Sequence, residues 1–557
     1  MRRFTTLVRV SLALSLCGLA ACASSSTTEG GGSSGGGSGG TVKQEQTLQS
    51  SAGGASTTIP PRSEPAGKIT MVWHLGYSPV QFDPQEAPTG VTNYAFYYML
   101  HDSLVKHFPG QQLAPSLAVS YKVAEDYKSA TFTLRDGIKF HNGEPITAED
   151  VKFSFENYKG VNSKVLKDMT EKIETPDPKT VNFTFKSPFL DFLTIYGTPA
   201  SGAGWIVPKK YYTEVGADGF KAKPVGAGPY KFVRGTSNSE FEFEAVADYW
   251  RKSPNVKTIV VKHVTDEATR FAALATGEAD MMTVVSGGLL ETAKKTPGVT
   301  LAQFSTAPFW LELVGWEKPD SPFNNVKVRQ AISLALDRKA INDAETGGFS
   351  KIDRGYWMEE ARIDALPKES VKPEWSEFNL TKAKQLMAEA GFPNGFEVSQ
   401  LTPLPPYNSL AERVITQLGE IGIKTKLNKM DRAAFLEAIN KGQDALPGIV
   451  LNVTGLNGDS AGVVRAFATC KGVSSRTCVP EIDAKMAAYD ASINLAERQK
   501  LVKEAQQIIG DQWIFPYVYN VGLTMAHGPR IANPWQEIWY SIPQYPYAYP
   551  YEDIKLK

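Results

Sequence analysis

The sequence predicts a mixed α/β fold, of the α/β or α+β kind, with several separate sheets. Strand-like segments with alternating apolar residues and helix-like segments with apolar residues every three or four positions follow one another, and neither kind dominates. Residues 67–557 are long enough for more than one domain. A content of 42% hydrophobic and 21% charged residues is ordinary for a globular protein, and we find no tandem repeat.

The chain begins with a pattern typical of export signals. Arg2 and Arg3 precede an apolar run over about residues 7–21, which ends in small residues directly before Cys22. The run is too short for a permanent transmembrane helix. We therefore expect residues 1–21 to be a lipoprotein signal peptide, because Leu-Ala-Ala-Cys resembles the bacterial lipobox, in which the thiol is lipidated. The alternative is an ordinary cleaved signal with an incidental cysteine.

Residues 22–66 are predicted to be the lipidated Cys22 followed by a flexible Gly/Ser linker. The segment has too few apolar side chains to offset the entropy of ordering it. Residues 36–40 match the G-x-S-x-G pattern of serine hydrolases, but that motif needs a strand before it and a helix after it. We therefore expect no catalytic serine there, and we expect an exported protein held to the cell envelope by its lipid.

Charge and cysteine content exclude several other functions. The 59 basic and 59 acidic residues balance, and no basic block is present, so we expect no nucleic-acid partner. The histidines have no compact ligand spacing, and we predict no metal site and no cofactor. Cys470 and Cys478 lie close together in an exported chain, which predicts a local disulfide; two free thiols are the alternative.

The elements expected in the first half of the body are mostly strands. Asp136 and Gly137 predict a hairpin between strands at 130–135 and 138–141. Thr147 and the acidic residue three positions later predict a capping box at the start of a helix. Further strands are expected at 69–74, 180–185, 230–233 and 259–263, and helices at 92–105 and 267–276.

Helices are more frequent in the second half. The expected helix at 381–390 ends at a glycine with a proline just beyond it, a common stop signal. Other helices are expected at 326–341 and 411–421, and a strand at 423–427.

A series of segments resembles family 5 of the extracellular solute-binding proteins, the peptide/nickel class that serves bacterial ABC importers. The most specific segment reads LRDGIKFHNGEPITAEDVKFSF at residues 134–155. The others follow at the spacing of the family, at 224–232, 247–250, 276–280, 326–338 and 388–395. The resemblance extends over essentially all of residues 67–557.

The resemblance implies a two-lobed periplasmic-binding-protein-like fold that closes on a solute between its lobes. It implies lobe 1 at residues 67–310 with an extra subdomain at about 89–195, lobe 2 at 311–514 and a return to lobe 1 at 515–557. It also implies as partners a small-molecule or peptide solute and the transmembrane subunits of an ABC permease. We expect a monomer that touches the membrane only through its N-terminal lipid.

Dipeptide-binding members of this family typically carry Gly-Trp-x-Gly-Asp in lobe 2, where the aspartate pairs with the α-ammonium group of the peptide. The matching stretch, residues 452–459, has Val453 in place of the tryptophan and Leu456 in place of the aspartate. Asp459 is the nearby carboxylate and our candidate ligand anchor; a turn or capping role is the alternative. This departure favours a solute that is less cationic than a free-amine peptide.

Three aromatic residues are further candidates for lining the cleft. Tyr77 follows the first strand, and Trp310 and Trp316 flank the expected first crossing into lobe 2. Aromatic side chains with a polar tip suit wet cavities. For each of them, packing between domains is the alternative.

These observations together predict a solute-binding lipoprotein of an ABC importer that captures a peptide or peptide-like solute and is not an enzyme. Two alternatives remain open. An exported hydrolase would need a nucleophile–base pair or a metal cluster. A ligand-sensing receptor would use the same two lobes.

Overall fold

The structure is a computed structural model. It describes residues 63–86, 91–109, 111–160, 162–197, 202–352, 370–439, 441, 445–453, 460–472, 474–534, 537 and 547–557. The expected signal peptide and most of the linker, with Cys22, lie outside these ranges. Residues 58–557 form one compact unit. Among the described residues, no helix has the length and apolar character needed to cross a membrane.

A nine-stranded mixed sheet carries both lobes, in the order β14-β16-β12-β17-β11-β1-β10-β9-β8. β1 pairs in parallel with β10 and β11, whereas β12 pairs antiparallel with β16 and β17. The bounds are β1 Ala66–Trp73, β8 Tyr230–Thr236, β9 Glu240–Ala245, β10 Val256–His263, β11 Met281–Met282, β12 Thr300–Leu313, β14 Leu401–Pro403, β16 Ile449–Val453 and β17 Tyr517–His527.

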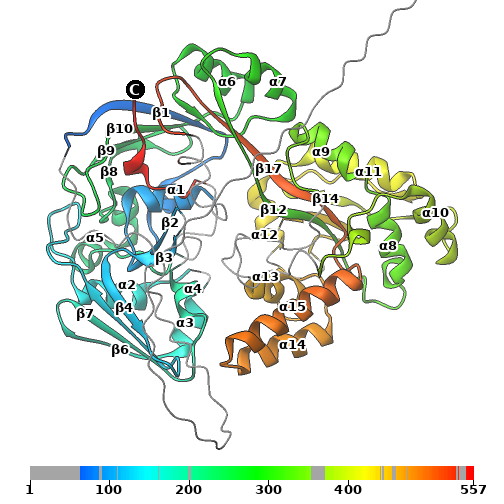
Figure 1. The fold of residues 1–557 in the computed structure, drawn as a ribbon, viewed down its shortest axis with the longest axis horizontal. Coiled ribbons are helices and arrows are strands. Elements are labelled where there is room, and N and C mark those ends of the chain that lie inside the picture. The colour runs from blue at the N-terminus through cyan, green and yellow to red at the C-terminus, as the bar shows by residue number, and fades with distance from the viewer. Residues whose placement is uncertain are drawn as a thin grey trace, which may run out of the picture. The chain divides into compact units, whose positions relative to one another are not determined.

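The strands β12 and β17 pass side by side from one lobe to the other, and we call them the crossing pair (Figure 1). The register in which β12 pairs with β17 shifts between Ser305 and Pro308 of β12. Phe304 before this shift packs in the lobe 1 core, and Phe309 after it packs in the lobe 2 core. The two cores are therefore joined at an irregular point of an otherwise continuous pair of strands.

The subdomain of lobe 1 has its own four-stranded sheet and its own core. The sheet has the order β4-β5-β7-β6. In both β5 and β7 every second residue is buried, as expected for strands with one face on a core. The bounds are β2 Val105–Phe108, β3 Gln111–Pro115, β4 Ala118–Val123, β5 Ser129–Leu134, β6 Thr170–Asp177 and β7 Thr180–Phe185.

The hairpin predicted between residues 130–135 and 138–141 is wrong. Gly137 does form a turn with a positive φ of 69°. However, β5 already has β4 on one edge and β7 on the other, so no edge remains for a third partner. Lys139 forms only an isolated bridge with Pro145.

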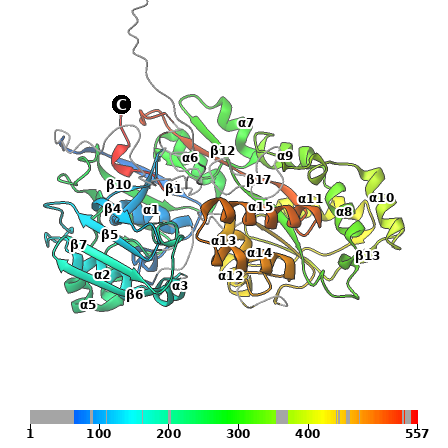
Figure 2. The same ribbon diagram turned by 60° about the horizontal axis from the view of Figure 1, so that its bottom comes forward.

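Helices surround the sheets in both lobes (Figures 1 and 2). In lobe 1 they are α1 Val91–Leu100, α2 Ala148–Asn157, α3 Ser163–Met169, α4 Phe192–Tyr196, α5 Lys209–Ala222, α6 Glu267–Thr276 and α7 Gly287–Lys295. In lobe 2 they are α8 Val326–Leu334, α9 Arg338–Thr346, α10 Leu380–Glu389, α11 Asn408–Gly419, α12 Arg432–Ile439, α13 Ser460–Ala468, α14 Pro480–Ala491 and α15 Leu495–Asp511. Two-stranded pairing of β13 Phe396–Glu397 with β15 Ile423–Lys424 completes lobe 2.

Local end signals were predicted correctly at several helices. Asp150 accepts a hydrogen bond from the Thr147 backbone N–H at 2.9 Å, which confirms the capping box of α2. α6 covers the predicted residues 267–276, and Gly277 follows it in the left-handed conformation with a φ of 79°. The helix predicted at 326–341 is instead two helices, because Asp337 caps a new helix by accepting from the Ala340 N–H at 2.9 Å.

Candidate functional site

The end of β1 and the helix α6 form one wall next to the crossing pair. Trp73 is buried at the end of β1, and its ring lies 5.4 Å from the ring of Tyr547. His74 follows, with Nδ1 3.0 Å from the Thr283 hydroxyl. Burial is the main cause that lowers the pKa of His74 to about 3. The positive charges of Arg270, in lobe 1, and of Arg432, in lobe 2, act in the same direction. His74 is therefore neutral at physiological pH.

Arg270 is a buried cation on α6. Its side chain is 3% exposed, and its Nη1 donates to the carbonyl oxygens of Val264 and Thr265 at 2.8 Å each. α6 packs on β11, the strand next to β17 in the sheet. Arg270 thus belongs to the part of lobe 1 that adjoins the crossing pair.

Lobe 2 contributes a second wall through Arg432, Tyr407 and Tyr519. Arg432 is the first residue of α12, and its Nη1 donates to the Pro405 carbonyl at 2.7 Å. The ring of Phe309, on β12, lies 4.6 Å from the ring of Tyr407 and 5.6 Å from that of Tyr519. This wall is therefore built directly on the crossing pair.

Charges of both lobes act on two residues of the lobe 1 wall, His74 and Tyr547. Arg432 of lobe 2 is among the charges that lower the pKa of His74 in lobe 1. Burial, helped by Tyr407, raises the pKa of Tyr547, and the charges of Arg270 and Arg432 oppose this rise. We call Trp73, His74, Arg270, Arg432 and Tyr547 the hinge cluster.

A second contact between the lobes lies away from the hinge cluster and is built on Asp191, just before α4 of lobe 1. Its carboxylate pairs with Arg498 of α15, and it accepts from Arg465 of α13 and from the Tyr489 hydroxyl at 3.5 Å each. The guanidinium groups of Arg498 and Arg465 lie 3.8 and 4.9 Å from the centre of the Tyr489 ring. Figure 2 shows α13, α14 and α15 grouped together in lobe 2. We call this the Asp191 contact.

Inside lobe 2, a buried polar network holds the loop between the two cysteines. Glu312 of β12 accepts from Arg476 at 3.1 Å, from Asn452 at 2.8 Å and from the Trp310 indole at 3.2 Å. Arg476 lies between Cys470 and Cys478, whose sulfur atoms are bonded at 2.08 Å. The network therefore fixes this loop to β12 and to β16, directly before the stretch that carries Asp459.

The aromatic residues predicted to line the cleft are buried in this structure. Tyr77 donates its hydroxyl to the Val261 carbonyl at 2.6 Å and packs in the lobe 1 core. Trp310 packs between Phe467 and Phe515, and Trp316 donates to the Thr477 hydroxyl. These contacts favour the packing role for all three. A ligand-lining role for them stays a prediction, and Asp459 lies outside the described residues.

Sequence reasoning missed Arg270 and Arg432. A signal existed for Arg270, because it lies four positions before Leu274 on the buried face of α6, where a charge is unusual. Arg432 begins a helix, where the helix dipole disfavours a cation. Neither signal indicates which residue of the other lobe lies opposite.

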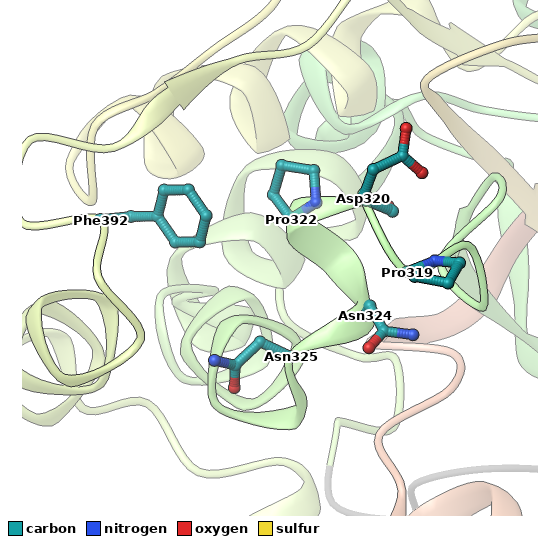
Figure 3. Close-up of a pocket in the computed structure, with 7 residues that line it drawn as sticks. Pro319, Asp320, Pro322, Asn324, Asn325 and Phe392 are labelled. Carbon is teal, nitrogen blue, oxygen red and sulfur yellow. The ribbon is translucent and has the colours of Figure 1, made fainter.

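Two surface hollows lie on single lobes. One, of about 400 Å³, is formed in lobe 2 by Pro319, Asp320, Ser321, Pro322, Asn324, Asn325 and Phe392 (Figure 3). The other, of about 490 Å³, is formed in lobe 1 by Thr147, Glu149, Asp150, Lys209, Lys210, Thr213 and Glu214. Neither contains a residue of the hinge cluster. The described residues hold no group of three or more His, Cys, Asp or Glu arranged to bind a metal ion.

Two cores joined by a crossing pair, with charged residues of both facing each other, define a two-lobed binding protein of the kind that closes on a small solute. Sequence comparison gives the family. A sequence model of the bacterial extracellular solute-binding proteins, family 5 middle region, matches residues 112–475, and the chain belongs to this family. The expected resemblance is thereby confirmed. Members of the family are the solute-binding proteins of ABC importers and are not enzymes, so the hydrolase alternative is excluded.

Relatives bear names that refer to different solutes. The chain is 27% identical over 509 residues to heme-binding protein A of Haemophilus influenzae, covering 83% of this chain and 89% of that protein. It is 28% identical over 447 residues to the glutathione-binding protein GsiB of Salmonella typhi, covering 75% and 83%. The solved structure of AgaA from A. tumefaciens R10, in complex with agropinic acid, has a TM-score of 0.71 at 25% identity and covers 88% and 98%. The two-lobed fold is thereby confirmed.

Proposed function

We propose that this protein is the solute-binding lipoprotein of an ABC importer, acting as a monomer that captures a peptide or peptide-like small solute between its lobes and delivers it to a membrane permease. The crossing pair carries this proposal, because two strands that join separate cores allow the lobes to move together on a solute. The Asp191 contact agrees with it, since it joins a carboxylate of lobe 1 to an arginine of lobe 2.

The sequence before the folded body supports a lipid anchor at Cys22. The cysteine follows an apolar run and small residues, and the linker after it gives a tethered domain freedom to reach a permease. Such an anchor holds the protein at the cell envelope, in the periplasmic space or on the outer face of the cytoplasmic membrane.

One feature of the sequence supports a peptide-like solute that is not strongly cationic. Leu456 occupies the place at which dipeptide-binding members carry an aspartate for the α-ammonium group. Asp459, in the same stretch, remains the proposed ligand anchor, and a carboxylate can also accept from a neutral N–H or O–H group of the solute. The names of the relatives given above refer to heme, glutathione and agropinic acid. These are small organic molecules with acid groups, so proteins with this fold can bind solutes of that kind.

The anchor is tested by expressing the full chain in a bacterial host that processes lipoproteins. We expect the protein in the membrane fraction, with the mass of a diacylglycerol on its first mature residue. Cys22→Ser should release it or block its processing, whereas Cys17→Ser, within the signal, should leave the anchor intact. A Cys22→Ser variant that is still cleaved after residue 21 and still found in the membrane fraction would contradict the lipoprotein assignment.

Solute capture is tested by native mass spectrometry of the freshly purified protein and by thermal unfolding with peptides, opines, sugars and metal chelates. A bound solute should add a defined mass, and a true ligand should raise Tm in proportion to the logarithm of its concentration above Kd. If no compound in these classes changes Tm and no adduct is present, the protein does not capture such solutes.

A further inference from the structure

The helices α7 of lobe 1 and α9 of lobe 2 touch each other on the far side of the crossing pair from the Asp191 contact. They pack directly against one another, and we call this the α7–α9 contact. Figures 1 and 2 both show α7 and α9 on one side of the crossing pair and α13 and α14, next to the Asp191 contact, on the other. The lobes therefore meet on both sides of the strands that join them.

Glycines bring the two helices unusually close together. A Cβ on Gly287, the first residue of α7, would lie 2.7 Å from the carbonyl oxygen of Ala344 and 3.1 Å from that of Glu345. A Cβ on Gly347, directly after α9, would lie 2.5 Å from Cδ2 of Leu290. Non-bonded carbon atoms pack best about 3.5–4.0 Å apart. A methyl group at Gly287 would press against backbone, which side-chain rotation cannot relieve, so the helices would have to separate.

Each helix is fixed to its own lobe. Ala293 of α7 is buried in a small core with Val72 of β1. Ile341 of α9 packs in the lobe 2 core, and the segment after α9 is tied to β17, because Asn520 donates its backbone N–H to the Lys351 carbonyl at 3.0 Å. The distance between α7 and α9 therefore changes when the lobes rotate against each other.

The ends of the helices that meet are electrostatically complementary. A helix carries a partial positive charge at its N-terminus and a partial negative charge at its C-terminus. Gly287 begins α7, whereas Ala344 and Glu345 lie in the last turn of α9. The two ends attract each other until the glycine backbone touches these carbonyl groups, and beyond that point they repel. Attraction with a hard limit is what a mechanical stop requires.

We propose that the α7–α9 contact is a stop that limits how far the lobes open, so that the spacing of these two helices sets the balance between open and closed forms. This inference rests on the proposed function, because it concerns the movement by which a solute would be captured. When two bodies rotate about an axis that lies between two contacts, one contact loosens as the other tightens. Opening at Asp191 therefore presses α7 towards α9, and closure relieves that pressure.

The stop predicts an effect of unusual sign. Packed protein is nearly incompressible, so a group added between α7 and α9 acts as a wedge. The wedge has least room in the open form, and it therefore favours the closed form, although it adds no contact to a solute. Removing bulk from the same place should favour the open form.

The test is Gly287→Ala, and Gly288→Ala is its matched control. Both place a methyl group in the first turn of α7, but a Cβ on Gly288 has only the Ser286 hydroxyl oxygen within 4 Å, at 3.9 Å. In the solute-free full chain we expect Gly287→Ala to raise the ratio of closed to open forms by about fivefold, and Gly288→Ala to change it less than about twofold.

The ratio is measured by double electron–electron resonance between two nitroxide labels, one on each lobe. The labels are attached through Lys164→Cys in α3 and Lys500→Cys in α15, because these side chains are 87% and 64% exposed. The distribution of distances between the labels gives the populations of open and closed forms without any knowledge of the solute. Thermal unfolding of each variant shows that it is folded.

Leu290→Ala is the second variant, and it removes the side chain that lies against Gly347. We expect the ratio of closed to open forms to fall by about fivefold. Both substitutions lower stability, so opposite shifts in the distance distribution cannot arise from destabilisation alone. Equal distributions for Gly287→Ala and Gly288→Ala, or a shift in the same direction for Gly287→Ala and Leu290→Ala, overturn the inference.

Asp191→Asn separates the failure of this inference from the failure of the proposed function. If Asp191→Asn shifts the distribution but Gly287→Ala does not, the lobes move and only the stop is refuted. If no variant shifts the distribution, the lobes do not move, and capture by closure is refuted together with the stop. Opposite shifts for Gly287→Ala and Leu290→Ala, in a protein for which no solute is found, uphold the stop and count against solute capture alone.

Discussion

Replacing Asp191 by asparagine should weaken the contact between the lobes without unfolding the protein. The Asp191 contact brings one carboxylate of lobe 1 to two arginines and a tyrosine hydroxyl of lobe 2. Asp191 precedes α4 as its N-cap residue but makes no capping hydrogen bond from its side chain. The substitution therefore removes the interlobe charge and leaves the helix as it is.

The size of the effect follows from the burial of the partners. The side chain of Arg498 is 5% exposed and that of Asp191 is 18% exposed. Exposed pairs contribute about 0–1 kcal/mol, and breaking a fully buried pair costs about 3–5 kcal/mol. This pair lies between these cases, and asparagine keeps one acceptor, so we expect a loss of about 2 kcal/mol, or a roughly 30-fold change in the ratio of closed to open forms.

Small-angle X-ray scattering without solute measures the change directly. Asp191→Asn should increase the radius of gyration, and solute Kd should rise by up to about 30-fold if closure is required for binding. Asp168→Asn is the matched control, because Asp168 also lies in the subdomain and pairs with a lysine, but within the exposed helix α3. If both variants match the wild type in radius of gyration and in affinity, the Asp191 contact contributes nothing to closure.

Three further predictions concern stability. Burial lowers the pKa of His101 to about 3 and that of His141 to about 4. Between pH 6.5 and about 4 the unfolded chain therefore binds more protons than the folded protein. Urea unfolding should show that the free energy of unfolding falls on acidification through that range, by about 1.4 kcal/mol per pH unit for each histidine. Glu312→Gln should cost about 3–5 kcal/mol in urea unfolding, because it leaves the Arg476 guanidinium buried without its counter-charge; a cost below 1 kcal/mol would contradict this. Gly226→Ala should lower Tm or the soluble yield, because its Cβ would lie 1.8 Å from the Leu100 carbonyl oxygen, whereas the control Gly419→Ala meets nothing within 4 Å and should be neutral.

The sequence predicts the ends of helices in this fold better than it predicts which strands pair with each other. Helix ends follow from the capping box at Thr147 and the left-handed Gly277, because such signals act over a few residues. The hairpin after Asp136 was predicted from an equally local turn signal, but strand pairing is decided by partners elsewhere in the chain. The edges of β5 are taken by β4 and by β7, and the latter lies about fifty residues away.

The candidate site was hidden from the sequence for the same reason. Arg270 and Arg432 belong to different lobes, and the chain between them forms part of the crossing pair and much of lobe 2. No local pattern relates them to His74 or to Tyr547. The resemblance to the family predicted that two crossing segments join the lobes, but it offered no residue correspondence for these arginines. Only the packed structure shows that both act on His74 and Tyr547.

The Asp191 contact joins opposite charges of the two lobes, so it favours closure whether or not solute is present. To shift a binding protein from 1% to 99% closed, a solute must bind the closed form about 10⁴-fold more tightly. A constitutive contact of about 2 kcal/mol lowers that requirement about 30-fold. Because the contact acts without solute, the effect of Asp191→Asn on the radius of gyration should be larger in the solute-free protein than in the protein saturated with solute. An equal effect in both states would show that the contact does not set the balance between open and closed forms.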